Sequence, residues 1–139
     1  MYITASFAAI LTFFFIRLSF KVIELRKLHR TPLGGEDIEP LKRAIRAHGN
    51  FVEYVPLSLI LMGVLELNGA PTIWISLLGT FLLLGRHFHA KGMISDGVNF
   101  QNRVIGMKFT LVGLALLALS NVMWLAYVFV ASAKFAAIH

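Results

Sequence analysis

The sequence predicts an all-α membrane protein built as a bundle of four transmembrane helices. Of its 139 residues, 58% are hydrophobic and 14% are charged, whereas a soluble domain is nearer half apolar and a quarter charged. The apolar residues also fall into blocks of about 20, the length that crosses a bilayer as a helix. We therefore expect one membrane domain over residues 1–139, with spans at about 2–25, 41–67, 71–90 and 101–131.

The first span begins at the N-terminus and is expected to stay uncleaved. Its apolar stretch is longer than the core of a secretory signal, and no basic segment precedes it. Arg17 and Lys21 interrupt its later turns, where they either extend toward the membrane surface or face a neighbouring helix. The polar segment 26–42 follows, and its Pro32 and paired glycines predict a loop.

The other three spans have recognisable boundaries. Pro56 lies inside the second span, where a membrane helix accepts proline as a kink because neighbouring groups satisfy the freed carbonyl. Pro71 suits the first turn of the third span. The second polar loop, 93–102, contains an Asp96-Gly97 turn signal and leads into the fourth span.

Basic residues are distributed unevenly between the loops, which predicts an orientation. The short turn 68–71 has none, whereas both polar loops are flanked by several, so we expect these loops in the cytoplasm and both termini on the other side. The polar clusters would then gather at one membrane face. These basic residues are Lys21, Arg26, Lys27, Arg30, Lys42, Arg43, Arg46, Arg86, Lys91, Arg103 and Lys108.

Charge and cysteine content exclude several functions. The net charge of +6 does not indicate nucleic acid as a partner, because the basic residues adjoin apolar runs, where they set topology and meet anionic lipid. The chain has no cysteine, which excludes disulfides, thiolate metal sites and cysteine nucleophiles.

A polar stripe at the start of the second span is the most informative feature. At about 100° per residue, Arg46, Asn50 and Glu53 lie on one helical face. Charged groups this close to a membrane interior usually face protein or water. One interpretation is a structural ion pair that satisfies its own charges. The other is a site for a zwitterionic ligand, in which Arg46 binds a carboxylate and Glu53 an ammonium group.

Two further clusters lie at the same membrane face. Arg86, His87 and His89 end the third span, and we expect them to be interfacial side chains, since a His-x-His pair without a nearby carboxylate or thiolate is a weak metal signal. No metal is expected. Arg103 opens the fourth span as an interfacial anchor or, alternatively, as a cation that lowers the pKa of a thiol. Such a thiol would have to belong to a ligand.

The pattern Arg46-x-x-x-Asn50-x-x-Glu53-Tyr54-x-Pro56 resembles the MAPEG family, the membrane-associated proteins of eicosanoid and glutathione metabolism. The basic loop after the first span, the end of the third span and Arg103 agree with this resemblance, which covers essentially the whole chain. The short loops are most similar to the small bacterial members.

The resemblance implies a homotrimer in a bacterial inner membrane, with glutathione bound between subunits near the cytoplasmic face. By position, it implies that Arg103 faces the sulfur as the catalytic residue and supports thiolate formation. Arg26 or Arg30 would come from the neighbouring subunit, and His48 is a weaker candidate on the same wall as the stripe. The implied glutathione-binding residues are Arg46, Asn50, Glu53, Tyr54, His89, Arg26, Arg30 and His48.

Three positions depart from better-known family members, which leaves several functions open. Met93 replaces a ligand-binding tyrosine, Met107 lacks a hydroxyl and Val104 stands where one branch has serine. The first hypothesis is a glutathione-dependent transferase or peroxidase acting on lipophilic electrophiles or hydroperoxides. The alternative is a non-catalytic binding or assembly protein with the same fold. A small transporter is disfavoured, because transporter sites lie near the membrane midplane.

Overall fold

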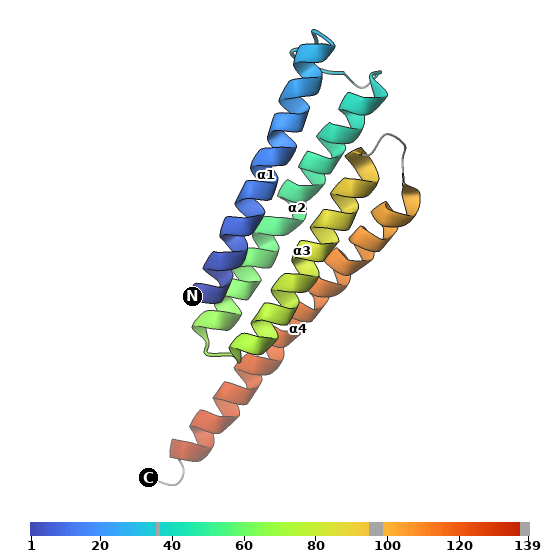
Figure 1. The fold of residues 1–139 in the computed structure, drawn as a ribbon. Coiled ribbons are helices and arrows are strands. Elements are labelled where there is room, and N and C mark those ends of the chain that lie inside the picture. Colours follow the sequence, from blue (N-terminus) through green and yellow to red (C-terminus); the bar gives the residue numbers. More distant parts are fainter. Residues whose placement is uncertain (36, 95–98, 137–139) are drawn as a thin grey trace.

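The computed structural model describes residues 1–35, 37–94 and 99–136, and these form four helices in an up-down-up-down bundle (Figure 1). Helix α1 spans Tyr2–Leu28, α2 Glu39–Leu67, α3 Thr72–Ile94 and α4 Phe100–Ala136. The predicted all-helical bundle is confirmed. The expected Asp96-Gly97 turn lies outside the described residues.

The helices extend a few residues beyond the predicted spans at most of their ends. Helix α1 continues to Leu28, where Arg26 and Lys27 occupy the last turn and favour the helix dipole. Pro71 stands just before α3 rather than in its first turn, and its carbonyl accepts hydrogen bonds from Trp74 N and Ile75 N at 3.0 and 3.3 Å. The apolar pattern indicates which part of a helix lies in the hydrocarbon of the membrane. The helix itself ends where its backbone hydrogen bonds end, which is a few residues further on.

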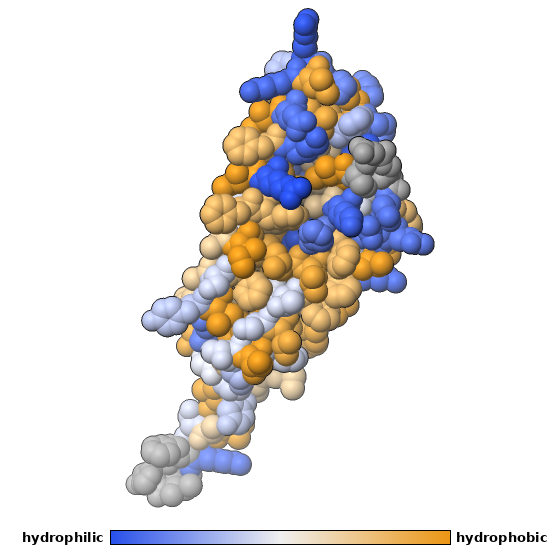
Figure 2. Space-filling view, viewed as in Figure 1, coloured by the Kyte–Doolittle hydropathy of each residue, from blue (hydrophilic) through white to orange (hydrophobic). Residues whose placement is uncertain are grey.

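The exposed surface of the bundle suits a lipid environment. Helices α1, α2 and α4 are each long and apolar enough to cross a membrane. Helix α3 is not among these three candidate spans, and its last turns hold Arg86 and Lys91, yet Ile73 and Leu77 on its outer side are exposed as well. Figure 2 shows polar side chains concentrated at the end of the bundle that carries the two long connections, with a broad apolar surface below them.

The core is uneven, and helix α1 is its most lightly packed member. Its buried residues are Thr4, Leu11, Leu18 and Leu25, which recur every seven positions and therefore form one narrow line of contact. Helices α3 and α4 pack more closely, because glycines on the two helices face each other. In Figure 1, the α1–α2 hairpin rises beyond the end of α3, while α4 projects past the opposite end of the bundle.

Glu66, near the end of α2, caps the start of α1. Its carboxylate oxygens accept hydrogen bonds from the backbone N–H groups of Ile3 and Thr4 at 3.0 and 2.8 Å. The first N–H groups of a helix have no partner within the helix, so a carboxylate from a neighbouring helix both satisfies them and complements the dipole.

We predict that Glu66→Ala lowers the free energy of unfolding by about 1–2 kcal/mol, the usual value of a lost N-terminal cap. Detergent titration of the purified protein, followed by circular dichroism, measures this change. Glu24→Ala is the matched control, because Glu24 is an exposed α1 carboxylate that pairs only with Lys21 among the described residues. Equal effects of the two substitutions would contradict the capping role.

Candidate functional site

The predicted polar stripe lies on the outward face of α2. Phe51 and Val55 face the core, while Arg46 and Glu53 are exposed on the other side of the helix. No ion pair among the described residues joins Arg46 to Glu53, and their two-turn separation is about 10 Å along the axis. A single chain therefore does not neutralise these charges by pairing them with each other.

Asn50, between the two charges, is held by a buried arginine from α3. Arg86 is 2% exposed, and its Nη1 donates to Asn50 Oδ1 at 2.6 Å and to the Asn50 carbonyl at 3.2 Å. Its Nε donates to Thr110 Oγ1 on α4 at 3.1 Å. The guanidinium carbon also lies 5.6 Å from the ring centroid of Tyr54. One side chain thus connects three helices and fixes the orientation of Asn50.

The expectation that Arg86 and His89 are interfacial was wrong, although His87 is exposed as predicted. The reason is the close approach of α3 and α4 at Gly85 and Gly106. A Cβ built at Gly106 would meet backbone atoms of His89 and the Gly85 carbonyl oxygen. Without side chains at these two positions, the helices approach until the end of α3 is covered.

The main feature that was not predicted from the sequence is that Arg86 is buried and connects α2, α3 and α4. Gly85 directly precedes Arg86, and Thr110 follows Gly106 by one helical turn. Small residues at one-turn spacing indicate close helix contact in membranes. The sequence signal for this buried polar contact was a glycine beside Arg86 on one helix and a glycine one turn from Thr110 on the next.

His48 faces away from the stripe. Its Nε2 lies 3.1 Å from Ser19 Oγ and its ring stacks on Phe15 at a centroid distance of 4.9 Å, so it belongs to the α1–α2 contact. Side chains two positions apart on a helix point about 200° away from each other around its axis. This explains why His48 and Asn50 contact different neighbours. The structure does not bring His48 together with Arg46 and Glu53.

The remaining predicted site residues lie at the same end of the bundle. Arg103 is exposed on the first turn of α4, where Gly92 of α3 packs against its backbone. Arg26 is occupied within its own loop, because its Nη1 donates to the carbonyls of Thr31, Pro32 and Gly34 at 3.0–3.3 Å. Arg30 is exposed and has a φ of 51°.

Comparisons with known proteins identify the family. The family model described as "MAPEG family" matches residues 4–133, which is nearly the entire chain. The chain belongs to the MAPEG family. It is 34% identical over 132 residues to the inner membrane protein YecN of Escherichia coli K12, covering 95% of this chain and 99% of the relative. The YecN of Escherichia coli O6:H1 matches to the same extent.

As a MAPEG member, the chain is a multi-pass membrane protein with a four-helix bundle. Of the two methionines that depart from the expected MAPEG pattern, Met107 contacts the stripe and Met93 is buried in α3. Met93 is 7% exposed near the end of α3, and the Sδ of Met107 lies 4.0 Å from Asn50 Nδ2. Within the described ranges, no group of three histidine or acidic side chains is arranged to hold a metal ion.

Proposed function

We propose that this protein is an integral membrane glutathione-dependent transferase or peroxidase. The observation that carries the proposal is the outward stripe of α2, where an exposed guanidinium and an exposed carboxylate flank an immobilised amide. Arg46 and Glu53 are about 10 Å apart along the helix, and an extended tripeptide spans about the same distance. A zwitterionic tripeptide is therefore matched to the stripe in both charge and length.

In this proposal, Arg46 binds a carboxylate of glutathione and Glu53 binds its ammonium group. Asn50 offers its amide group to the peptide, since Arg86 fixes its orientation by binding Oδ1. Tyr54 lies at the edge of the same face, beside Arg86. Charge-assisted hydrogen bonds of this kind are shorter and stronger than neutral ones.

The stripe lies on the outside of one chain, so a closed site requires a second surface. We infer that a neighbouring copy in a homotrimer supplies it. Arg30 is the better candidate for a contribution from that neighbour, because the Arg26 guanidinium already binds three loop carbonyls. His89 is buried against α4, so its contact with glutathione stays a prediction, as does the role of His48.

The chemistry follows from where the two reactants are found. The cytoplasm supplies glutathione and the bilayer supplies the lipophilic substrate, and holding both in one orientation lowers the entropic part of the barrier.

Arg103 stabilises the glutathione thiolate. In transfer, the thiolate sulfur bonds to an electrophilic carbon while the bond to the leaving group breaks, and a leaving group such as halide departs with its electron pair. In peroxide reduction, two glutathione molecules become a disulfide while the hydroperoxide becomes an alcohol and water. We propose a bacterial inner membrane as the location, which the similarity to the inner membrane protein YecN supports.

Glutathione affinity tests the binding half of the proposal. We expect Arg46→Ala and Glu53→Ala each to weaken binding by about 1–3 kcal/mol, because each removes a charged partner of the ligand. Isothermal titration in detergent measures the effect, with Lys42→Ala and Glu39→Ala as controls on the exposed first turn of the same helix. Unchanged affinity in both stripe variants would refute the assignment.

Turnover tests the catalytic half. Arg103→Ala should lower kcat by about a hundredfold, as expected when one group that stabilises developing charge is removed. Glutathione affinity should change much less, because this guanidinium acts on the thiolate. Conjugation of an aryl halide and reduction of a lipid hydroperoxide are the assays, and Lys108→Ala, an exposed cation on the same helix, is the control. Equal losses in kcat and affinity would contradict a thiolate role.

A non-catalytic binding or assembly protein is the second candidate. The observation that favours it is Met107 beside Asn50, together with Met93 on α3, since neither methionine provides a hydroxyl to hold a substrate or donate a proton. Glutathione binding without turnover of either substrate would support this alternative.

A further inference from the structure

A large cleft between α1 and α3 lies outside the proposed glutathione site. Its volume is about 870 Å³, and all of its lining residues come from α1 and α3. It exists because α1 contacts the bundle along one narrow line, which leaves the space beside its central turns unfilled. A volume of this size is typical of ligand pockets.

The cleft combines apolar walls with unmatched positive charge. Phe13, Phe14 and Phe20 form much of its α1 side. Lys21 is neutralised by Glu24, whose two oxygens each lie 3.1 Å from the ammonium group. Arg17 and Lys91 also line the cleft, and neither takes part in an ion pair among the described residues.

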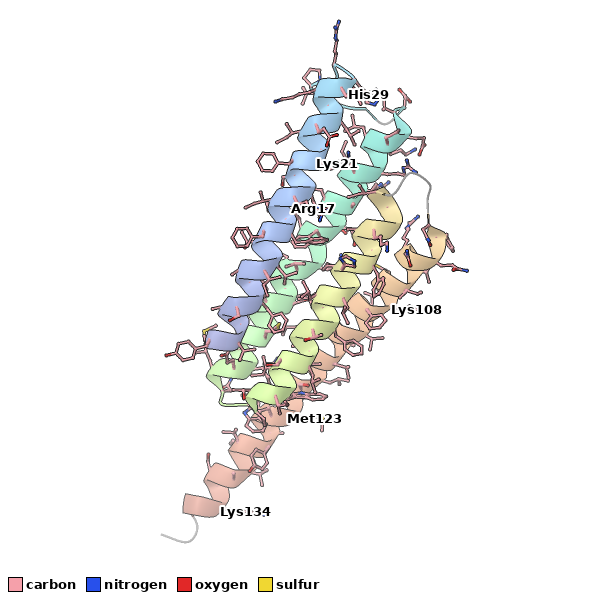
Figure 3. The ribbon with its side chains drawn as sticks, in the orientation of Figure 1. Arg17, Lys21, His29, Lys108, Met123 and Lys134 are labelled. Atoms are coloured by element: carbon pink, nitrogen blue, oxygen red, sulfur yellow. The ribbon has the colours of Figure 1, made fainter. Side chains whose placement is uncertain are left out.

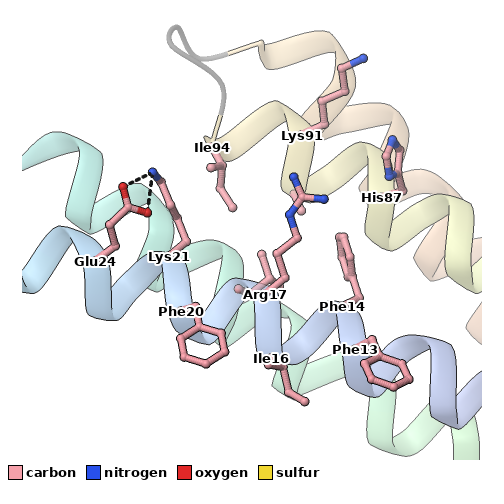
Figure 4. A pocket seen from close by; sticks show the side chains of 12 residues that line it. Phe13, Phe14, Ile16, Arg17, Phe20, Lys21, Glu24, His87, Lys91 and Ile94 are labelled. Atoms are coloured by element: carbon pink, nitrogen blue, oxygen red, sulfur yellow. Dashed lines mark hydrogen bonds and ion pairs between the residues drawn. The ribbon is translucent and has the colours of Figure 1, made fainter.

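The two unmatched cations line the cleft from opposite sides, Arg17 from α1 and Lys91 from α3. Figure 4 shows the Arg17 side chain extending from α1 toward the part of α3 that carries His87 and Lys91, while the Lys91 side chain points away from the Arg17 guanidinium. Phe13 and Phe20 point away from α3, along the outer surface of α1, and both are exposed at 74% and 64%. The cleft is therefore cationic between the helices and apolar along its outer rim.

The position of Arg17 indicates what kind of molecule reaches it. Arg17 lies on α1 at the level of the last turns of α3, well short of the end of the α1–α2 hairpin (Figure 3). It is about 16 Å from the end of α1, at about 1.5 Å per residue. Phe13, Ile16 and Phe20 surround its base, so the cation stands at the side of the bundle among apolar side chains. A phospholipid, with its headgroup next to its acyl chains, matches this combination.

We propose that this cleft binds an anionic phospholipid. The phosphate would bind the Arg17 guanidinium, because its planar fork matches phosphate oxygens, and the exposed Lys91 side chain would turn toward the phosphate and add a point charge. The first part of an acyl chain would lie along Phe13 and Phe20. Basic pockets between membrane helices on the cytoplasmic side suit anionic headgroups for the same reasons.

Native mass spectrometry of the full-length protein in non-ionic detergent tests the proposal. Phosphatidylglycerol should bind more tightly than phosphatidylcholine of the same acyl chains. Arg17→Gln and Lys91→Gln should each weaken phosphatidylglycerol binding about fivefold, the effect of one surface cation on anionic lipid, while Arg17→Lys should retain most of the affinity. Lys108→Gln is the control, because Lys108 is an exposed cation that does not line the cleft.

Four results would overturn the proposal. Equal binding of the two phospholipids would show that charge is not recognised, and an unchanged Arg17→Gln variant would show that the lipid binds elsewhere. Tighter binding of free palmitate than of phosphatidylglycerol would identify a fatty-acid site. A change in oligomeric state in Arg17→Gln would identify a contact between copies. Glutathione affinity should be unaffected by Arg17→Gln, so failure of this proposal is distinguishable from failure of the proposed function.

Discussion

Gly106→Ala should destabilise the bundle by about 3 kcal/mol, at the upper end of the usual cost of overpacking. The added Cβ would meet the backbone of His89, and it would lie 2.7 Å from the Gly85 carbonyl oxygen. Backbone atoms of a packed helix cannot rotate aside as a flexible side chain does. Helices α3 and α4 would have to separate, which also uncovers Arg86 and His89.

Gly113→Ala is the matched control for this prediction, because it adds the same methyl group to the same side of α4. Its new Cβ would find its nearest neighbour at 3.7 Å, an ordinary contact. Replacing glycine by alanine inside a helix then stabilises by up to about 1 kcal/mol. Unfolding by sodium dodecyl sulfate in mixed micelles measures both variants. If both changed stability alike, close packing at Gly106 would not be the determining factor.

Arg86→Lys should lower the free energy of unfolding by about 3 kcal/mol, and Arg86→Met should lower it by less. The guanidinium fork reaches Asn50 on α2 and Thr110 on α4 at the same time. A lysine keeps the buried charge but cannot match the fork geometry, and an unsatisfied buried charge costs several kcal/mol. Methionine fills similar space without a charge. It removes the donors to Asn50 Oδ1 and Thr110 Oγ1, but it leaves no buried charge without a partner.

Glutathione affinity separates the structural and functional effects of Arg86. Both variants should bind glutathione about tenfold more weakly, since Asn50 is no longer held, a loss of about 1.4 kcal/mol. Asn50→Ala should show a similar loss in the wild-type background and little further loss in Arg86→Met, because the two residues act as one unit. Additive losses would show that Arg86 does not act through Asn50. The same mixed-micelle titration compares the stabilities of the two variants. The prediction is contradicted if Arg86→Lys is more stable than Arg86→Met.

The sequence by itself was sufficient for the fold class and for the stripe on α2. Long apolar blocks leave few alternatives in a membrane, because every backbone N–H and carbonyl must be satisfied within the segment. The α2 stripe follows from helical periodicity alone, so Arg46 and Glu53 were found without knowledge of their neighbours. The same geometry places His48 on another side of the helix, and a helical wheel would have excluded it from that wall.

What only the tertiary structure decided was which polar residues are buried and what they contact. Arg86 and His89 have the sequence pattern of interfacial residues, yet opposed glycines bring α4 over them. The α1–α3 cleft likewise has no sequence signature, since it arises from the narrow contact line of α1 and is lined by Arg17 and Lys91 from separate helices. Periodicity specifies the direction of a side chain on its own helix, whereas burial depends on how closely another helix approaches.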